Sequence, residues 1–185
     1  MAYHHGRLRE TLIDAAITAI EEEGVDRLSL RDLARRVGVS HAAPAHHFGD
    51  RTGLFTAIAA DGFDRLADVL EASGGDFVEA GVAYVGFATA ERGRFEVMYR
   101  RELLRDDDAA LVAARDRAGD VLRAGADGEP GDARANALAA WSIVHGFATL
   151  WNAGAIDAPA GTAPTAMARA VAGRLFPDAR PPSEG

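Results

Sequence analysis

Histidine side chains can bind a metal or transfer a proton, and four of the six histidines of this chain occur as adjacent pairs. His5 directly follows His4, and His47 directly follows His46. Two metal ligands on one face of a helix are normally four residues apart, so neither pair has the spacing of a zinc site. The chain also has no cysteine, and it has no nucleophile-elbow, phosphate-loop or dinucleotide-binding pattern. The sequence therefore predicts neither a metal site nor a cofactor, and it predicts that the protein is not an enzyme.

Histidine and arginine side chains also bind nucleic acid, and this chain concentrates both near its N-terminus. Residues 27–51 contain five arginines and two aspartates, a net charge of +3 in a chain whose total is −8, so the remainder carries −11. Five of the six histidines lie within the first 47 residues. A basic segment on an acidic body is typical of a nucleic-acid-binding module joined to a second domain. A solvated charged surface is the alternative interpretation of the same pattern.

The elements that must carry these residues are helices. Apolar residues recur at helical spacing, glycine and proline mark the breaks, and no segment has the alternation of a strand. The sequence therefore predicts an all-α fold, with an N-terminal three-helix module and a C-terminal helical bundle. The expected helices span about residues 7–23, 30–37, 41–48, 51–72, 77–90, 93–104, 107–124, 133–154 and 165–176, with a loop at 125–132.

The stretch "GVSHAAPAHHFGDR", residues 38–51, contains the turn between two short helices. Ser29 is expected to cap the first of these helices and Ser40 the second, with Gly38 in the left-handed conformation between them. Two short helices after a longer one predict a helix-turn-helix module, with a generic three-helix bundle as the alternative. The second short helix has only small, polar or imidazole side chains in its first turns, which lets the backbone approach a DNA groove closely. Pro44 falls in its first turn, where a missing N–H costs little.

The segment "LSLRDLARRVGVSHAAPAHHFGDRTGLFTAIA" resembles the DNA-binding region of the tetracycline-repressor (TetR) family of bacterial transcription regulators, and the likeness extends over about residues 7–60. The resemblance implies two sets of contacts with double-stranded DNA. The residues expected to face bases are His41, Ala42 and His46. The residues expected to hold phosphates are Arg7, Ser29, Ser40, His47 and Arg51. The chain departs from the family at two positions, because Ala45 replaces a phosphate-contacting tyrosine and Pro44 replaces a large aliphatic residue.

Small residues form stripes along the last two expected helices. Spacings of four and three residues alternate along Ala135, Ala139, Ser142, Gly146, Thr149 and Ala153, and a second stripe contains Ala166, Ala170 and Gly173. Such stripes let two helices approach closely, either within one chain or between two chains. The segment "WSIVHGFATLW", residues 141–151, resembles the C-terminal domain of a TetR branch named for its Trp-His-Gly residues. The family resemblance implies that these two helices form a homodimer, through Ser142, Gly146, Thr149, Ala153, Ala166, Ala170 and Gly173.

Aromatic side chains and methionine gather between residues 63 and 99, as they do in an ordinary core or around a ligand. The family resemblance implies a small-molecule pocket between the fourth and eighth helices. The residues expected to contact a small apolar ligand are Phe95, Met98, Tyr99, Trp141 and His145. The last two are four residues apart and therefore share a helix face.

Residues 135–156 contain no charge, and this run is long enough to span a bilayer. Five polar side chains within it make a helix buried on all sides a better interpretation than a membrane span. The N-terminus has no apolar run of the kind found in signal peptides. We therefore expect a cytoplasmic protein with no membrane partner.

These features predict a DNA-binding domain at residues 1–50, a ligand-binding and dimerisation domain at 51–178, and a disordered tail at 179–185. The predicted function is sequence-specific DNA-binding transcription regulation, by a repressor that a small ligand releases from a palindromic operator. The alternative is a helical adaptor that uses the three-helix module for contacts with other proteins.

Overall fold

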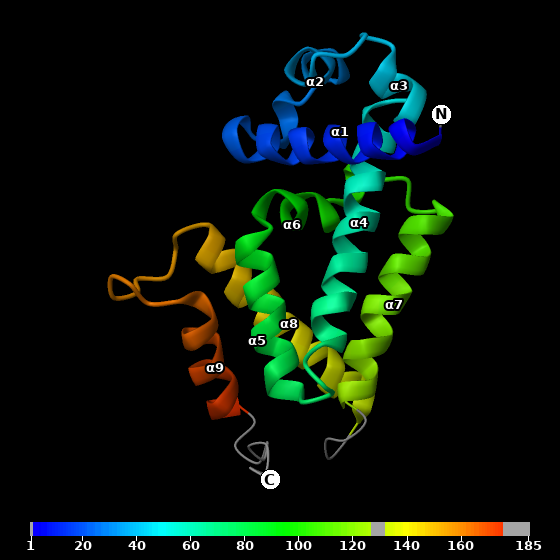
Figure 1. Cartoon of the computed structure of the whole chain (residues 1–185). Helices are drawn as coiled ribbons and strands as arrows, with labels where there is room; N and C mark the ends of the chain where they lie inside the picture. Colours follow the sequence, from blue (N-terminus) through cyan, green and yellow to red (C-terminus); the bar gives the residue numbers. More distant parts are fainter. Residues whose placement is uncertain (1, 127–131, 176–185) are drawn as a thin grey trace. The chain divides into compact units, whose positions relative to one another are not determined.

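The chain folds into helices in the computed structural model, which describes residues 2–126 and 132–175 (Figure 1). Within these residues there are α-helices and two short 3-10 helices but no strand, which confirms the predicted all-α fold. In chain order the elements are α1 (Ala2–Glu23), η1 (Val25–Arg27), α2 (Leu30–Val37), α3 (Ala43–Phe48), α4 (Arg51–Glu71), α5 (Phe77–Ala90), α6 (Arg92–Met98), η2 (Arg101–Leu103), α7 (Ala109–Ala126), α8 (Ala133–Asn152) and α9 (Pro164–Leu175).

The chain divides into two compact units. The first contains residues 1–63 and 92–115, and the second contains residues 64–91 and those from 116 onward. Helices α4 and α7 contribute residues to both units, because each continues across a unit boundary.

In the first unit, helices α1, α2 and α3 pack against one another as the predicted three-helix module (Figure 1). Helix α1 buries the apolar face that its sequence predicts, with Leu12, Ala16 and Ile20 almost fully covered. Buried residues from the other helices of this unit include Leu33 of α2, Phe48 of α3, and Leu54, Phe55 and Ile58 of α4. Burial of a side chain of this size stabilises the fold by about 1.5–3 kcal/mol. The short helices are therefore fixed in place by a shared apolar core.

Helix α5 is the centre of the second unit, and α8 and α9 each pack chiefly against α5 rather than against each other. Two glycines of α5 permit these contacts. A Cβ atom on Gly81 would lie 3.2 Å from Val144 Cγ1 of α8, and a Cβ atom on Gly86 would lie 3.3 Å from Thr165 Cγ2 of α9. The small residues on α5 therefore bring both helices close to its backbone.

One predicted helix is divided in two. The sequence predicts a helix over about 93–104, whereas α6 ends at Met98 and is followed by η2. The backbone leaves the helical conformation at Arg100, with φ −89° and ψ 75°. The Nε atom of Arg100 lies 3.0 Å from Glu102 Oε1. Because residues two apart do not face each other on a helix, this ion pair requires a break in the helix.

Helix α7 begins two residues later than the sequence predicts. Oδ1 of Asp108 accepts hydrogen bonds from the N–H groups of Ala110 and Leu111, each at 3.1 Å. These bonds satisfy two of the amide groups that have no partner within the helix. The last of three consecutive aspartates therefore caps the helix.

The uncharged run at 135–156 lies in α8 and the residues after it, but α8 is not buried on all sides as predicted. The helix packs on α5 through one face, and its opposite face is exposed at Leu138 and Leu150. Among the described residues, no helix is both long and apolar enough to cross a membrane. The predicted loop at 125–132 lies mostly outside the described residues, and residues 176–178 and the predicted tail at 179–185 lie outside them entirely.

Candidate nucleic-acid interface

Helix α2 begins with the capping serine that the sequence predicts. Ser29 Oγ accepts a hydrogen bond from the N–H of Asp32 at 3.1 Å and donates one to Asp32 Oδ2 at 2.6 Å. The Ser29 hydroxyl, followed by the nearby arginines, holds the pKa of Asp32 below its ordinary value. At the other end, Gly38 adopts φ 75° and ψ 31°, a left-handed conformation that favours glycine. Both ends of α2 are therefore fixed by local sequence.

The start of α3 differs from the prediction that Ser40 caps this helix. The N-cap is Ala42, and the helix begins at Ala43. A helix capped by Ser40 needs a hydrogen bond from the N–H of residue 44 to the Ser40 carbonyl, and Pro44 has no N–H. The Ser40 carbonyl instead accepts from Ala43 at 3.0 Å, and the first helical bond runs from His46 to Ala42 at 2.9 Å. The proline therefore delays the start of the helix by two residues.

Two buried side chains anchor α3 to the first unit. The ring of Pro44 is fully buried and that of Phe48 nearly so. Proline thus occupies a buried position where the family usually has a large aliphatic residue. Between these two anchors, Ala45 and His46 are exposed, and His47 is half-buried. The helix therefore presents small and imidazole side chains to solvent without losing its own attachment.

The three residues predicted to face bases lie on this exposed surface, since His41, Ala42 and His46 are all exposed. Among the residues predicted to hold phosphates, Arg7 of α1 and Ser40 of the turn are exposed. The other members of that set are more covered, because Ser29, His47 and Arg51 are half-buried.

Arg51 is partly engaged within the protein. Its Nη2 atom donates a hydrogen bond to the Val25 carbonyl at 2.6 Å, which joins α4 to η1. Its guanidinium carbon lies 4.8 Å from the centre of the Phe55 ring, and its buried Nε atom has no hydrogen-bond partner in the structure. Only part of this guanidinium is therefore available to a phosphate.

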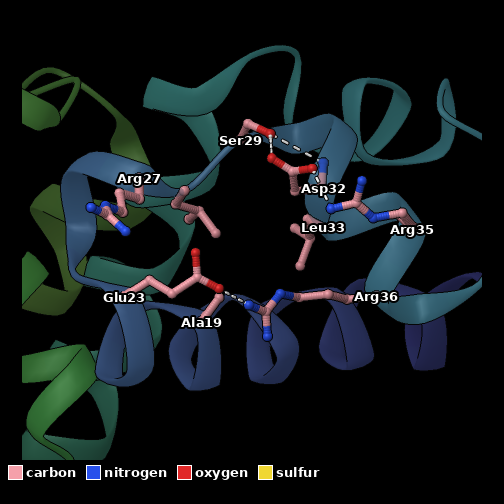
Figure 2. Close-up of a pocket in the computed structure, with 9 residues that line it drawn as sticks. Ala19, Glu23, Arg27, Ser29, Asp32, Leu33, Arg35 and Arg36 are labelled. Atoms are coloured by element: carbon pink, nitrogen blue, oxygen red, sulfur yellow. Dashed lines mark hydrogen bonds and ion pairs between the residues drawn. The ribbon is translucent and has the colours of Figure 1, made fainter.

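The fold neutralises part of the positive charge of residues 27–51. Arg36 pairs with Glu22 at 2.8 Å and also with Glu23, and Arg35 pairs with an aspartate of its own helix at 2.8 Å. Figure 2 shows the pairs of Arg35 with Asp32 and of Arg36 with Glu23 beside a hollow of about 110 Å³. The charge counted along the sequence overstates the local charge, because the two glutamates belong to α1 and lie outside the counted segment.

Three residues of the predicted ligand set lie together in the first unit. Phe95 and Met98 of α6 are buried, and the Tyr99 ring lies 5.4 Å from that of Phe95 and 5.5 Å from that of Phe63. The Met98 sulfur packs closely on α4, because a Cβ atom on Gly62 would lie 2.6 Å from it. These side chains form a packed core cluster.

The other two residues of that set, Trp141 and His145, lie in the second unit, with their ring centres 5.4 Å apart. The Tyr84 hydroxyl of α5 is 2.9 Å from His145 Nδ1. Burial lowers the pKa of His145 below its ordinary value. Tyr84 is 61 residues from His145 in the sequence, so only the packing of α8 on α5 brings the two side chains together.

Five of the seven residues predicted to form a dimer are exposed within one chain. Ser142, Thr149 and Ala153 of α8 are exposed, as are Ala166 and Ala170 of α9. A Cβ atom added to Gly146 would meet nothing within 4 Å. Gly173 lies in the C-terminal part of α9. Packing on α5 therefore leaves most of the small-residue stripes exposed among the described residues.

Comparison with known families matches both parts of this arrangement. The family model described as "Bacterial regulatory proteins, tetR family" matches residues 12–58. The model described as "Tetracyclin repressor-like, C-terminal domain" matches residues 77–175, more than half of the chain. The chain belongs to the tetracycline-repressor family. The predicted Trp-His-Gly branch is not confirmed, because the C-terminal match is to a domain with a different description.

This TetR-family regulator is also similar to individual proteins along most of its length. An uncharacterised helix-turn-helix transcriptional regulator of Mycobacterium tuberculosis is 30% identical over 160 residues, which are 80% of this chain and 72% of that protein. A solved structure of a protein of unknown function from Rhodococcus sp. RHA1 has 37% identity and a TM-score of 0.77, and the match covers 95% of this chain and 96% of that one.

AibR, solved in complex with isovaleryl coenzyme A and operator DNA, has 16% identity and a TM-score of 0.72, with 91% of this chain and 98% of that one covered. At this identity the likeness shows the fold alone. The family assignment confirms the predicted DNA-binding transcription regulator. It gives no support to the adaptor alternative.

Proposed function

We propose that this TetR-family regulator is a repressor that reads its operator with the surface formed by residues 40–47. The observation that carries the proposal is the exposure of His41, Ala42 and His46 next to two buried anchors, Pro44 and Phe48. Small side chains let the backbone approach a major groove closely. The imidazole nitrogens can then exchange hydrogen bonds with base edges, and the alanine methyl can contact a thymine methyl.

Phosphate contacts by Arg7, Ser29, Ser40, His47 and Arg51 belong to the same proposal. Exposed Arg7 and Ser40 support it most directly. Ser29 caps α2, so the hydroxyl that it offers a phosphate is already hydrogen-bonded to Asp32. Arg51 contributes only the donors that do not contact the Val25 carbonyl.

The proposed regulator is a homodimer joined through the small-residue stripes of α8 and α9. The proposal is supported by the exposure of these stripes in a chain whose α8 and α9 already pack on α5. Two protomers related by a two-fold axis read a palindromic operator, with half-sites spaced by about one helical turn of DNA or a multiple of it. Residues 1–50 are the proposed DNA-binding domain, and residues 51–178 are the proposed ligand-binding and dimerisation domain.

A small, largely apolar ligand is proposed to bind the second of these domains in the cytoplasm and release the DNA. The candidate contacts are the cluster of Phe95, Met98 and Tyr99 and the pair of Trp141 and His145. AibR, which has the same fold, was solved with isovaleryl coenzyme A. Acyl coenzyme A compounds are therefore a second class of ligand to test, in which only the acyl chain is apolar and the coenzyme A part is charged. Release requires that the ligand bind the non-DNA-binding conformation more tightly, because equal affinity for both conformations shifts nothing.

Selection of binding sites from a random DNA library tests the DNA-binding proposal. The recovered duplex is then compared with a scrambled duplex of the same length and composition. At about 150 mM salt we expect the recovered site to bind at least about 1,000-fold more tightly, the lower end of the range for specific regulators. Equal affinity for the two duplexes would overturn sequence-specific recognition.

Tryptophan fluorescence tests the ligand proposal, because Trp141 and Trp151 are the two tryptophans of the chain. A metabolite panel that includes acyl coenzyme A compounds is screened for fluorescence change and, in parallel, for release of the selected operator. We expect at least one compound to cause both. A tight binder that quenches the fluorescence but leaves operator affinity unchanged would contradict release by the ligand.

A further inference from the structure

The junction between α3 and α4 carries a guanidinium from outside the helix-turn-helix segment. Arg105, which follows η2, places Nη2 2.8 Å from Asp50 Oδ2. The same nitrogen lies 3.9 Å from the position that a Cβ atom would take on Gly49, the residue that ends α3. An arginine 55 residues along the chain therefore reaches the C-terminal end of the helix proposed to read DNA.

The position of Arg105 is fixed by packing on α4. Its backbone N–H donates a hydrogen bond to Thr56 Oγ1 at 3.0 Å, and the Thr56 side chain is buried. The guanidinium fits because α4 has a glycine beside it. A Cβ atom on Gly53 would lie 3.0 Å from Arg105 Nη1 and only 2.0 Å from the carbonyl oxygen of Phe48. Any larger residue at position 53 would displace the guanidinium or the end of α3.

Arg105 retains the capacity for a second anionic partner. Its side chain is 46% exposed, and an arginine has five N–H donors, of which the bond to Asp50 uses one. Arg51, the residue at this junction for which the family resemblance implies a phosphate contact, is turned toward the Val25 carbonyl and the Phe55 ring. Of these two guanidinium groups at the start of α4, that of Arg105 is the more exposed.

The carboxylate of Asp50 lies at the junction between α3 and α4, where a nearby cation reduces its repulsion of bound DNA. Asp50 Oδ1 caps α4 by accepting a hydrogen bond from the N–H of Gly53 at 2.8 Å. The Gly53 amide, followed by the Arg105 guanidinium, holds the pKa of Asp50 below its ordinary value, so the carboxylate is charged at neutral pH. An unneutralised carboxylate at the end of α3 would repel the DNA backbone.

We propose that Arg105 is an additional DNA-binding residue, whose guanidinium contacts a backbone phosphate at the C-terminal end of α3 while it neutralises Asp50. The inference rests on the DNA-binding function proposed above. It adds a phosphate contact from a segment that lies outside residues 1–50. A guanidinium can serve two anions at once because its donors point in different directions within one plane.

The test compares Arg105→Gln with wild-type protein on the selected operator duplex and on a scrambled duplex, over a range of salt concentrations. One phosphate contact contributes about 0.9 to the slope of log affinity against log salt. Each protomer of the proposed dimer contributes one Arg105, so we expect the slope to fall by about 1.8 on both duplexes. The ratio of wild-type to variant affinity should then fall about 12-fold for a fourfold rise in salt. Arg101→Gln is the matched control, because Arg101 belongs to η2, is 75% exposed and pairs with Asp106 rather than with Asp50. It should leave the slope unchanged.

Two further variants separate a phosphate contact from simple neutralisation of Asp50. Asp50→Asn removes the charge but keeps an oxygen that can cap α4. In that background, Arg105→Gln should still flatten the salt dependence by about 1.8, or about 0.9 for each protomer. Arg105→Lys retains a positive charge and should keep the wild-type slope, which also shows that the position tolerates substitution.

Recovery of wild-type affinity and slope in the Asp50→Asn, Arg105→Gln double variant would overturn the inference, since Arg105 would then act only on Asp50. An unchanged slope in Arg105→Gln, or a slope in Arg105→Lys that falls as it does with glutamine, would also overturn it. A wild-type protein that binds neither duplex would instead overturn the DNA-binding function itself. The two failures are therefore distinguishable.

Discussion

Helices α3 and α8 both present small side chains on an exposed face, yet the residues around these faces differ. On α3 and the turn before it, the exposed alanines are accompanied by His41 and His46, and exposed arginines lie on the neighbouring segments. On α8 the exposed alanine, serine and threonine are flanked by Leu138 and Leu150, which are 57% and 52% exposed. No charged residue occurs between positions 135 and 156.

Small side chains let a partner approach the backbone closely, and the surrounding residues determine which partner gains from doing so. Imidazole and guanidinium groups favour a polyanion with hydrogen-bonding base edges. Exposed leucines around an uncharged stripe favour another apolar surface, because contact removes them from water. The same thin covering of side chains therefore supports DNA binding on α3 and self-association on α8.

Gly146→Leu should have the largest effect and would separate the two surfaces. The new side chain meets nothing within 4 Å of its Cβ atom in one chain, and leucine is a better helix former than glycine by about 1 kcal/mol. We therefore expect a folded protomer that sediments as a monomer. Its operator affinity should fall by about 100-fold or more, because the two half-sites are no longer bound by one linked dimer.

Ala113→Leu is the matched control for this change, because it adds a leucine to an exposed position of α7. It should leave both sedimentation and operator affinity unchanged. A Gly146→Leu variant that still sediments as the wild-type dimer would contradict the assignment of the α8 face.

Arg51→Ala should weaken DNA binding and the fold together. Loss of a phosphate contact lowers affinity for all duplexes alike and flattens the salt dependence. Loss of the bond to Val25 and of the contact with Phe55 should also cost about 1–2 kcal/mol in the free energy of unfolding. Urea unfolding and salt-dependent binding measure the two effects separately. Unchanged stability would show that the inward contacts of Arg51 contribute nothing.

Ala45→Tyr should sharpen the DNA-binding surface by restoring the residue that the family usually has. Position 45 is exposed, so the ring does not have to enter the core. One added phosphate hydrogen bond of about 1 kcal/mol in each protomer should raise the affinity of the dimer about 30-fold on operator and scrambled duplexes alike. Ala45→Phe has the same ring without the hydroxyl and should give no such gain. Equal gains from both variants would assign the effect to the ring.

The smallest expected effect is the pH dependence of stability that arises from His145 of α8. This histidine is half-buried, whereas His41 and His46 are exposed. Burial lowers the pKa of His145, so the unfolded chain binds a proton at this site at a higher pH than the folded chain does. Its contribution to stability is therefore present above about pH 6.5 and is lost as pH falls through the lowered folded-state pKa. Between about pH 7 and about pH 5, urea unfolding should show a larger loss of stability in wild-type protein than in His145→Gln. Equal losses would contradict a folded-state pKa that burial lowers.

The two ends of α2 depend on neighbouring residues and follow from the sequence. The Ser29 cap and the left-handed Gly38 set the ends of α2 through bonds within a few residues, and both are predicted correctly. The start of α3 is also a local matter, yet the prediction places it at Ser40. The missing N–H of Pro44 decides it, and it prevents the hydrogen bond that a cap at Ser40 requires.

The parts that depend on packing do not follow from the sequence. His145 meets Tyr84, and Asp50 meets Arg105, across separations of 61 and 55 residues. No local spacing indicates either pair, because each requires two elements to pack in one particular register. The hydrogen bond from Arg51 to the Val25 carbonyl is not predicted for the same reason. It forms only when η1 and α4 pack side by side.

Binding-site selection with wild-type protein and His41→Ala in parallel tests most directly whether residues 40–47 read DNA. The wild type should recover an inverted repeat, and the variant should recover the same repeat with a relaxed preference at the same base pair of each half-site. Loss of a base contact should reduce discrimination there by about 1–3 kcal/mol. An identical consensus with undiminished preference at every position, recovered by both proteins, would contradict the account.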